Sequence, residues 1–253
     1  FIAEYTRDPS KLRAQKSVFI KTYETDKLFQ TFAGYRASHA EAIDCEESTH
    51  MLERFKQLTR AVVGCEKVGL SEDDVPTYKS TFDGTMWYSV EEEYFTRLLA
   101  FVFQKPGTLP GVDVLIVDPS NEFGTGGTGK DTHGLVLKAI AGKEYCISCK
   151  PEQVFGCRFP VDFTQCKFMF YSEGKITEQQ AEYHKNHTTE EDCSIERKYE
   201  GTDKNAQHFE LQMQYSNETR KARHFDNGQR RSFVAKASST LKRTDGWFDD
   251  FYG

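Results

Sequence analysis

Alternation of apolar and polar residues recurs along the chain and predicts many short β-strands. The clearest case is the segment 207–216. Its apolar residues share one face and its polar residues share the other: Phe209, Leu211, Met213 and Tyr215 against His208, Glu210, Gln212 and Gln214. A period of two residues is typical of a strand that packs one face on a core and turns the other to water, as in an antiparallel sheet.

Further strands are predicted where β-branched and aromatic residues gather between turn signals. They cover residues 17–23, 112–117, 134–140, 145–149, 166–171, 193–199 and 231–237. For residues 134–140 a helix is the less favoured alternative. The dipeptide Asp83-Gly84 lies between two β-prone runs and predicts a hairpin. Apolar residues at three- and four-residue spacing indicate a helix over residues 46–63, with a strand over residues 58–63 as the alternative, and residues 178–187 suit a short helix. A helix start is expected at Asp8, because Pro9 suits the first helical position.

These elements predict a mainly β protein, an antiparallel β-barrel or sandwich with one or two peripheral helices. We expect one domain over residues 1–253, in which residues 200–253 add a hairpin and an aromatic, acidic docking tail. The 20 Phe and 12 Tyr against 4 Met favour aromatic-rich strands over a helical bundle.

Charge and hydrophobicity narrow the classes of partner. The net charge is -6, from 33 basic and 39 acidic residues, whereas general nucleic-acid binders usually carry a basic excess. The basic cluster near residues 220–231 is short, so we expect no nucleic-acid partner. The chain has no apolar run of the roughly 20 residues that span a bilayer. The pattern leaves the oligomeric state open.

Five of the seven cysteines fall between residues 144 and 193, together with His184 and His187. Clustered cysteines favour a disulfide-bonded, secreted protein, and sequons at Asn186 and Asn217 permit glycosylation. The alternative is zinc, bound by the cysteines of this segment: Cys146, Cys149, Cys157 and Cys166. The disulfide interpretation requires no cofactor, and both remain open at this point.

The glycine-rich segment 124–132 partly matches a phosphate-binding loop. Gly124, four further residues and Gly129-Lys130 have the required spacing. Asp131, however, occupies the position of the hydroxyl residue that binds magnesium, and the segment 134–140 is predicted to be a strand instead of the required helix. Residues 118–123 also separate the preceding strand from the loop. We therefore favour a plain connecting loop.

Residues 8–12, Asp-Pro-Ser-Lys-Leu, and residues 18–26, Val-Phe-Ile-Lys-Thr-Tyr-Glu-Thr-Asp, resemble the opening of tick salivary lipocalins of the histamine-binding type. Residues 112–117 resemble a later strand of that family, and Cys193 is similar to a late cysteine that fastens the barrel. The resemblance implies a secreted eight-stranded antiparallel barrel that holds a small ligand, an amine or a lipid, in its lumen.

The predicted function is that of a secreted protein holding an apolar or amine small molecule in a barrel cavity. Glu93 is the candidate polar anchor for the ligand, and the candidate wall residues are aromatic or thioether side chains: Phe19, Tyr23, Trp87, Phe103, Phe209, Met213 and Tyr215. One alternative is an enzyme that uses the same cavity for His or Cys acid–base chemistry. Another is an intracellular, zinc-stabilised interaction module.

Overall fold

The computed structural model of the chain describes residues 46–118, 127–155, 157–171, 175–199, 201–217, 231–243 and 246–249. The predicted helix start at Asp8 and the predicted strand over residues 17–23 lie outside this part of the chain, as do the candidate wall residues Phe19 and Tyr23.

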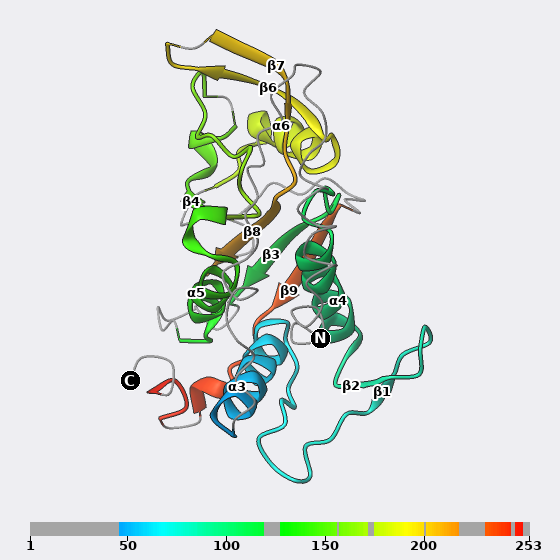
Figure 1. Cartoon of the computed structure of the whole chain (residues 1–253). Coiled ribbons are helices and arrows are strands. Elements are labelled where there is room, and N and C mark those ends of the chain that lie inside the picture. Colours follow the sequence, from blue (N-terminus) through cyan, green and yellow to red (C-terminus); the bar gives the residue numbers. More distant parts are fainter. Residues whose placement is uncertain are drawn as a thin grey trace.

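A parallel sheet of five strands forms the centre of the molecule (Figure 1). The strands follow the spatial order β4 (Cys146–Cys149), β5 (Phe168–Tyr171), β8 (Leu211–Ser216), β3 (Asp113–Val117) and β9 (Ser232–Lys236). Each neighbouring pair in this order is parallel. The prediction of a mainly antiparallel barrel or sandwich is therefore wrong.

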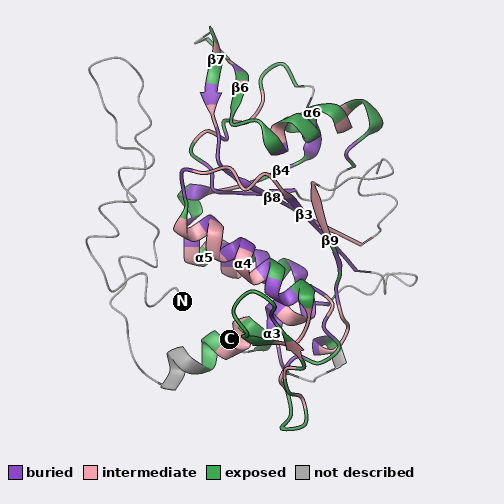
Figure 2. Ribbon diagram, turned by 90° about the vertical axis from the view of Figure 1, so that its right-hand side faces the viewer, coloured by how far each residue is buried: buried purple, intermediate pink, exposed green. Residues whose placement is uncertain are grey.

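Helices cover both faces of the sheet, as a parallel sheet requires. In Figure 2, α4 (Val90–Gln104) and α5 (Lys130–Ala141) lie on one side, with α3 (Glu46–Val62) beyond them. The opposite side carries α6 (Glu178–Thr189) and the antiparallel hairpin of β6 (Asp192–Arg197) and β7 (Gly201–Gln207). The fold is thus α/β, with three layers.

Several short elements complete the described chain. The strands β1 (Tyr78–Lys79) and β2 (Met86–Trp87) form the hairpin predicted at Asp83-Gly84. Single turns of 3₁₀-helix span Lys143–Tyr145, Pro151–Gln153 and Leu241–Arg243. No described helix is both long enough and apolar enough to cross a membrane.

Side chains of the central strands alternate between two cores. In β5, Phe168 and Phe170 pack against α3, α4 and α5, while Met169 and Tyr171 pack beneath α6. All four are buried. Burial of each large apolar side chain is worth roughly 1.5–3 kcal/mol, so both faces of the strand contribute to stability and neither is left to water.

The largest error of prediction in the secondary structure concerns residues 134–140, which belong to helix α5. The run Leu-Val-Leu suggests a strand, but buried residues of α5 follow a helical period: His133, Gly134, Leu137 and Ala141. A Cβ atom on Gly134 would lie 3.0 Å from a ring carbon of Tyr215. Glycine at this position lets the helix backbone approach β8 closely.

The six cysteines in the described part of the chain are free thiols. The expectation of a disulfide-bonded protein is therefore wrong for these residues. Cys149 and Cys166 are buried in the core beneath α6, where they pack as small apolar side chains.

Candidate functional site at the glycine-rich loop

The glycine-rich loop leads from the carboxyl end of β3 to the first turn of α5. All five residues of β3 are buried, and β3 lies between β8 and β9 in the sheet. In open α/β sheets, ligands bind outside the carboxyl ends of the strands. The order strand, glycine loop, helix is the context that a phosphate-binding loop needs, and it is present here.

Two glycines shape the described end of the loop. Gly127 has φ +111° and Gly129 has φ +82°, both in the left-handed region. A Cβ atom on Gly129 would lie 2.7 Å from Cδ1 of Leu58 and 2.9 Å from Cε1 of Phe248. A larger residue at position 129 would therefore be strained and would also collide with α3 and with the C-terminal segment.

Gly129 is also the N-cap of α5, and no side chain caps the helix there. The first N–H groups of a helix have no acceptor within the helix, and the helix dipole adds partial positive charge at that end. These groups form a ready site for an anion, above all for a phosphate.

Lys130, the first residue of α5, is buried together with a carboxylate. Its Nζ lies 3.9 Å from Oδ2 of Asp118, the residue that directly follows β3. Asp118 is fully buried, and the Thr128 hydroxyl donates a hydrogen bond to the same oxygen over 3.3 Å. The lysine is thus held beside the loop by a carboxylate that an incoming phosphate could replace as its partner.

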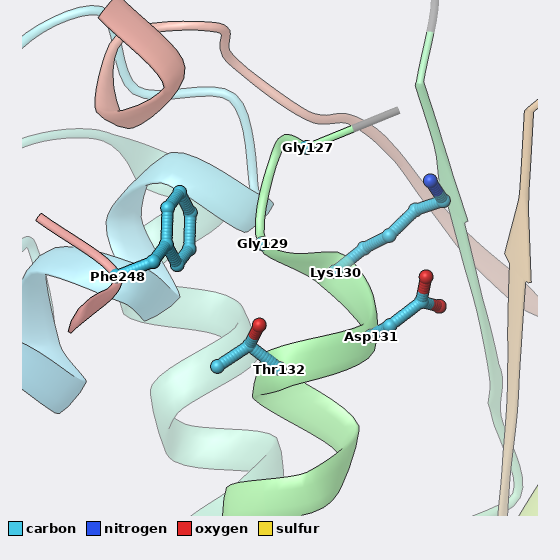
Figure 3. A pocket seen from close by; sticks show the side chains of 6 residues that line it. All are labelled: Gly127, Gly129, Lys130, Asp131, Thr132 and Phe248. Carbon is cyan, nitrogen blue, oxygen red and sulfur yellow. The ribbon is translucent and has the colours of Figure 1, made fainter. Parts of the chain in front are cut away.

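A pocket of about 220 Å³ opens at this helix end (Figure 3). Its lining comprises Phe248 and residues of the loop and the first turn: Gly127, Gly129, Lys130, Asp131 and Thr132. The side chains of Lys130 and Asp131 point toward the strands, whereas Thr132 and Phe248 lie on the other side of the helix end. Asp131 is exposed, and Thr132 is buried.

The neighbouring strand β8 brings a further polar group to the same edge. The Asp118 N–H donates to the Ser216 carbonyl over 2.9 Å, so the ends of β3 and β8 lie side by side. Asn217 follows directly, and its buried Oδ1 has no hydrogen-bond partner among the described residues. An amide oxygen in this position can accept a hydrogen bond from a water molecule.

Packing behind the loop fixes the start of α5. The His133 ring stacks on Phe55 at a centroid distance of 5.5 Å, and it contacts Phe95 at the same distance. Its Nδ1 lies 3.2 Å from the Tyr215 hydroxyl. Burial lowers the pKa of His133 to about 3, so this imidazole is neutral at neutral pH and serves as a packed core residue.

The candidate wall residues in the described chain lie in different surroundings. Phe103, Met213 and Tyr215 belong to, or pack against, the core between the sheet and α3–α5. Phe209 is buried beside the start of β8, and Trp87 is half-buried in the β1–β2 hairpin. With no barrel, they do not surround a lumen.

The candidate anchor Glu93 is occupied by partners of its own chain. Its Oε1 accepts hydrogen bonds from the Ser80 hydroxyl over 2.6 Å and from Arg97 Nε over 2.8 Å. These contacts tie the first turns of α4 to the β1–β2 hairpin, so the carboxylate stabilises the fold.

The cysteines considered for zinc are spread over both faces of the sheet and a surface loop. Cys146 is half-buried and packs against the core of α3–α5, whereas Cys149 and Cys166 lie in the core beneath α6. Cys157 is exposed, and its thiol donates to the Phe159 carbonyl over 3.3 Å. Asn186, the asparagine of the first predicted glycosylation sequon, is exposed on α6.

Comparison with solved structures supports the α/β fold and overturns the lipocalin resemblance. Three structures of the C-terminal region of NrS-1 in the apo state, two of them given as residues 305–718, superpose with TM-scores of 0.56, 0.54 and 0.53 at 17% identity. Each match covers 79% of this chain and 40–42% of the NrS-1 chain. No protein-family model and no curated protein matches the chain.

This likeness concerns the fold alone, because the identity is low. It is nevertheless incompatible with a secreted lipocalin-type ligand binder, whether the barrel cavity is used for sequestration or for catalysis. The signal for the site was present in the sequence as the spacing of Gly124, Gly129 and Lys130. Two features of the sequence argue against a phosphate-binding loop there: Asp131 replaces the expected hydroxyl residue, and residues 134–140 are predicted to form a strand.

Proposed function

We propose that the chain binds the phosphate groups of a nucleoside triphosphate, together with magnesium, at the N-terminus of α5. The observation that carries the proposal is the order of elements along the chain: a buried parallel strand, then a glycine-rich loop, then a helix that begins with Lys130. The loop glycines permit close approach of the backbone to phosphate, and the lysine supplies a positive charge.

The position of the loop in the sheet supports the proposal. β3 has a neighbour on each side, so residues that follow three adjacent strands can reach one ligand. Asn217 follows β8, and Asp118 follows β3. The pocket volume of about 220 Å³ suits a phosphate chain more than a whole nucleotide. The base and sugar would therefore extend beyond it, past Phe248.

Magnesium fits the carboxylates at this edge. Asp131 stands where phosphate-binding loops usually carry Ser or Thr, and its exposed carboxylate would repel phosphate without a cation. Mg²⁺ binds through one or two carboxylates together with substrate phosphates, so Asp131 and Asp118 are the residues that would hold it. The ion would neutralise phosphate charge, which makes the binding magnesium-dependent.

Hydrolysis of the bound nucleotide is a second candidate function, favoured by Asn217. Its buried amide oxygen, without a partner among the described residues, can accept a hydrogen bond from a water molecule. Side-chain amides orient the attacking water in some phosphoryl-transfer enzymes. Substitution of Asn217 by Ala should then reduce phosphate release while leaving nucleotide affinity within a few-fold.

The test of binding is a titration with a fluorescent ATP analogue, with and without Mg²⁺, followed by competition with inorganic triphosphate. We expect one saturable site that inorganic triphosphate empties. Lys130→Met should weaken binding by more than tenfold, because the charge on the phosphate loses its partner. Lys138→Met is the matched control, since Lys138 lies two turns further along α5 and bonds to Ser148.

Equal binding by the unmodified chain and by Lys130→Met would refute the proposed site. Absence of saturable binding at millimolar nucleotide, in protein whose circular dichroism shows a folded state, would refute the proposed function itself. If inorganic triphosphate fails to compete while the analogue binds, the analogue is held by its fluorophore or base, and the phosphate-binding role of the loop is wrong.

A further inference from the structure

A second polar cluster lies far from the glycine-rich loop, on the other side of the sheet. His187 comes from the last turn of α6, His208 follows β7 directly, and Glu210 directly precedes β8. Glu210 thus marks the amino end of a strand whose carboxyl end faces the loop. The two sites are therefore separate, at opposite edges of one sheet.

The three side chains converge on one another. Nε2 of His187 lies 2.7 Å from Oε1 of Glu210, and Nδ1 of His208 lies 3.1 Å from Oε2. One donor atom from each residue can be chosen so that all three lie within 4.8 Å of one another. Within the described residues, no other set of three such side chains meets this condition.

The two imidazole rings lie parallel, with centroids 4.1 Å apart and an interplanar angle of 9°. Each ring presents one nitrogen to the Glu210 carboxylate. The nearby ammonium of Lys167 donates to backbone oxygens instead, to Phe209 over 2.6 Å and to Thr108 over 3.5 Å. Within the described part of the chain, the side-chain hydrogen bonds of the Glu210 carboxylate thus join it to the two imidazoles.

Aromatic rings enclose the cluster. The Phe163 ring meets His187 edge-on at 4.6 Å and His208 at 5.6 Å, and Phe155 meets His187 at 5.7 Å. The side chains of His208 and Glu210 are fully buried, and that of His187 is 9% exposed. Three polar donors inside an apolar shell are a common setting for a bound metal ion, and the partly exposed His187 leaves a route from solvent.

We propose that His187, His208 and Glu210 bind a divalent transition-metal ion, with Zn²⁺ the best match to two imidazoles and one carboxylate. Zinc–ligand bonds of about 2.0–2.1 Å in a tetrahedron place the ligand atoms about 3.3 Å apart. The distances of 2.7 and 3.1 Å between the imidazole nitrogens and the Glu210 oxygens would have to lengthen slightly. Small rotations of the two rings would achieve this. A water molecule would complete the tetrahedron.

Such an ion would join two separate stretches of the chain. It would connect the end of α6 to the short segment 208–210, which leads from the β6–β7 hairpin into the central strand β8. We infer a structural role, because the ligands hold the end of α6 against the start of β8. An ion that binds only the folded state stabilises it by mass action, so chelation should lower the melting temperature.

The experiment is a titration of the chelator-treated, reduced full chain with Co²⁺ and then with Zn²⁺. We expect one equivalent of Co²⁺ with visible d–d absorption and without a thiolate-to-cobalt charge-transfer band, displaced by one equivalent of Zn²⁺. The chain carries seven cysteines, so this absence of the thiolate band separates the proposed site from metal bound by sulfur. Metal analysis gives the stoichiometry.

Two variants assign the site. His187→Gln should weaken metal binding by at least tenfold, whereas His184→Gln, one turn earlier on α6, should bind like the unmodified chain. Absence of bound metal, a thiolate band at the first equivalent, or undiminished affinity in folded His187→Gln would each overturn the proposal. Should both variants fail to fold, the spectrum of the unmodified chain still decides, because thiolate ligation or no binding contradicts it.

Discussion

The buried pair of Lys130 and Asp118 yields a quantitative prediction about the protein without ligand. Lys130 is 6% exposed, Asp118 is fully buried, and their charged atoms are 3.9 Å apart. Lys130→Met removes the cation of this pair, while the Thr128 hydroxyl still donates a hydrogen bond to the Asp118 carboxylate. We therefore expect the substitution to destabilise the fold as well as to weaken phosphate binding.

The magnitude follows from electrostatics. Two unit charges about 4 Å apart attract by about 4 kcal/mol at an effective dielectric constant of about 20. Removing one partner of a buried pair typically costs about 3–5 kcal/mol, and the hydrogen bond from Thr128 moderates the loss. We expect a loss of about 3 kcal/mol. At about 2–4 °C per kcal/mol for a chain of this size, the melting temperature should fall by about 6–12 °C.

The assay is chemical and thermal unfolding of three variants without nucleotide. Asp118→Asn/Lys130→Met removes both charges of the pair, so its stability should return to within about 1 kcal/mol of the unmodified chain, although its binding of triphosphate should stay as weak as that of Lys130→Met. Lys138→Met should change stability by less than Lys130→Met. The reasoning is refuted if Lys130→Met is as stable as the unmodified chain, or if the double variant is no more stable than the single one.

Three further predictions concern the surroundings of the loop. Asp131→Ser should make nucleotide binding less dependent on magnesium, because it removes a charge that repels phosphate; titrations with Mg²⁺ and with EDTA measure this, and an unchanged ratio of the two affinities would contradict it. Trp247→Ala should cost about 3 kcal/mol in urea unfolding, because Trp247 is 2% exposed and donates to Gln57 over 3.2 Å; a loss below 1 kcal/mol would contradict the packing of Trp247 against α3. His133 has a pKa of about 3 in the folded chain and about 6.5 when unfolded, so only the unfolded state takes up its proton as pH falls from 6.5 toward 3. Its contribution to stability should therefore decline by about 2 kcal/mol from pH 7 to pH 5, and His133→Phe should show a correspondingly flatter dependence in unfolding curves at each pH.

Most strands could be located from the sequence, but their environment could not. The segment 207–216 has the predicted two-residue period, and β8 occupies its second half. The polar face, however, is buried: Gln212 and Gln214 are each 2% exposed, and the Tyr171 hydroxyl donates to Gln212 over 2.8 Å. Periodicity shows which side chains share a face, whereas the partner on that face depends on the whole fold.

The local sequence pattern likewise could not show whether neighbouring strands run parallel or antiparallel. A strand with one polar face favours an antiparallel sheet, and the sequence pattern predicts another strand where helix α5 lies between β3 and β4. Once that helix is missed, the alternation of strand and helix that predicts a parallel sheet disappears. One wrong element near Leu135 and Leu137 thus changed the predicted fold class.

The two candidate sites differ in how far the sequence could reveal them. Gly129 and Lys130 are adjacent, and their spacing from Gly124 is a local signal that needed only the correct helix to become convincing. The cluster of His187, His208 and Glu210 joins residues from α6 and from the segment before β8. His208 and Glu210 share a face at a two-residue spacing, but no local spacing relates them to His187, so only the packing of α6 brings the three together.

The central claim, that the N-terminus of α5 binds triphosphate, is tested most directly by hydrogen–deuterium exchange of the backbone amides. On addition of magnesium and ATP, exchange over residues 127–133 should slow markedly, because phosphate oxygens accept hydrogen bonds from these N–H groups. Exchange around His187 and Glu210 should stay unchanged. Unaltered exchange over residues 127–133 at saturating nucleotide, or protection confined to another segment, would contradict the account.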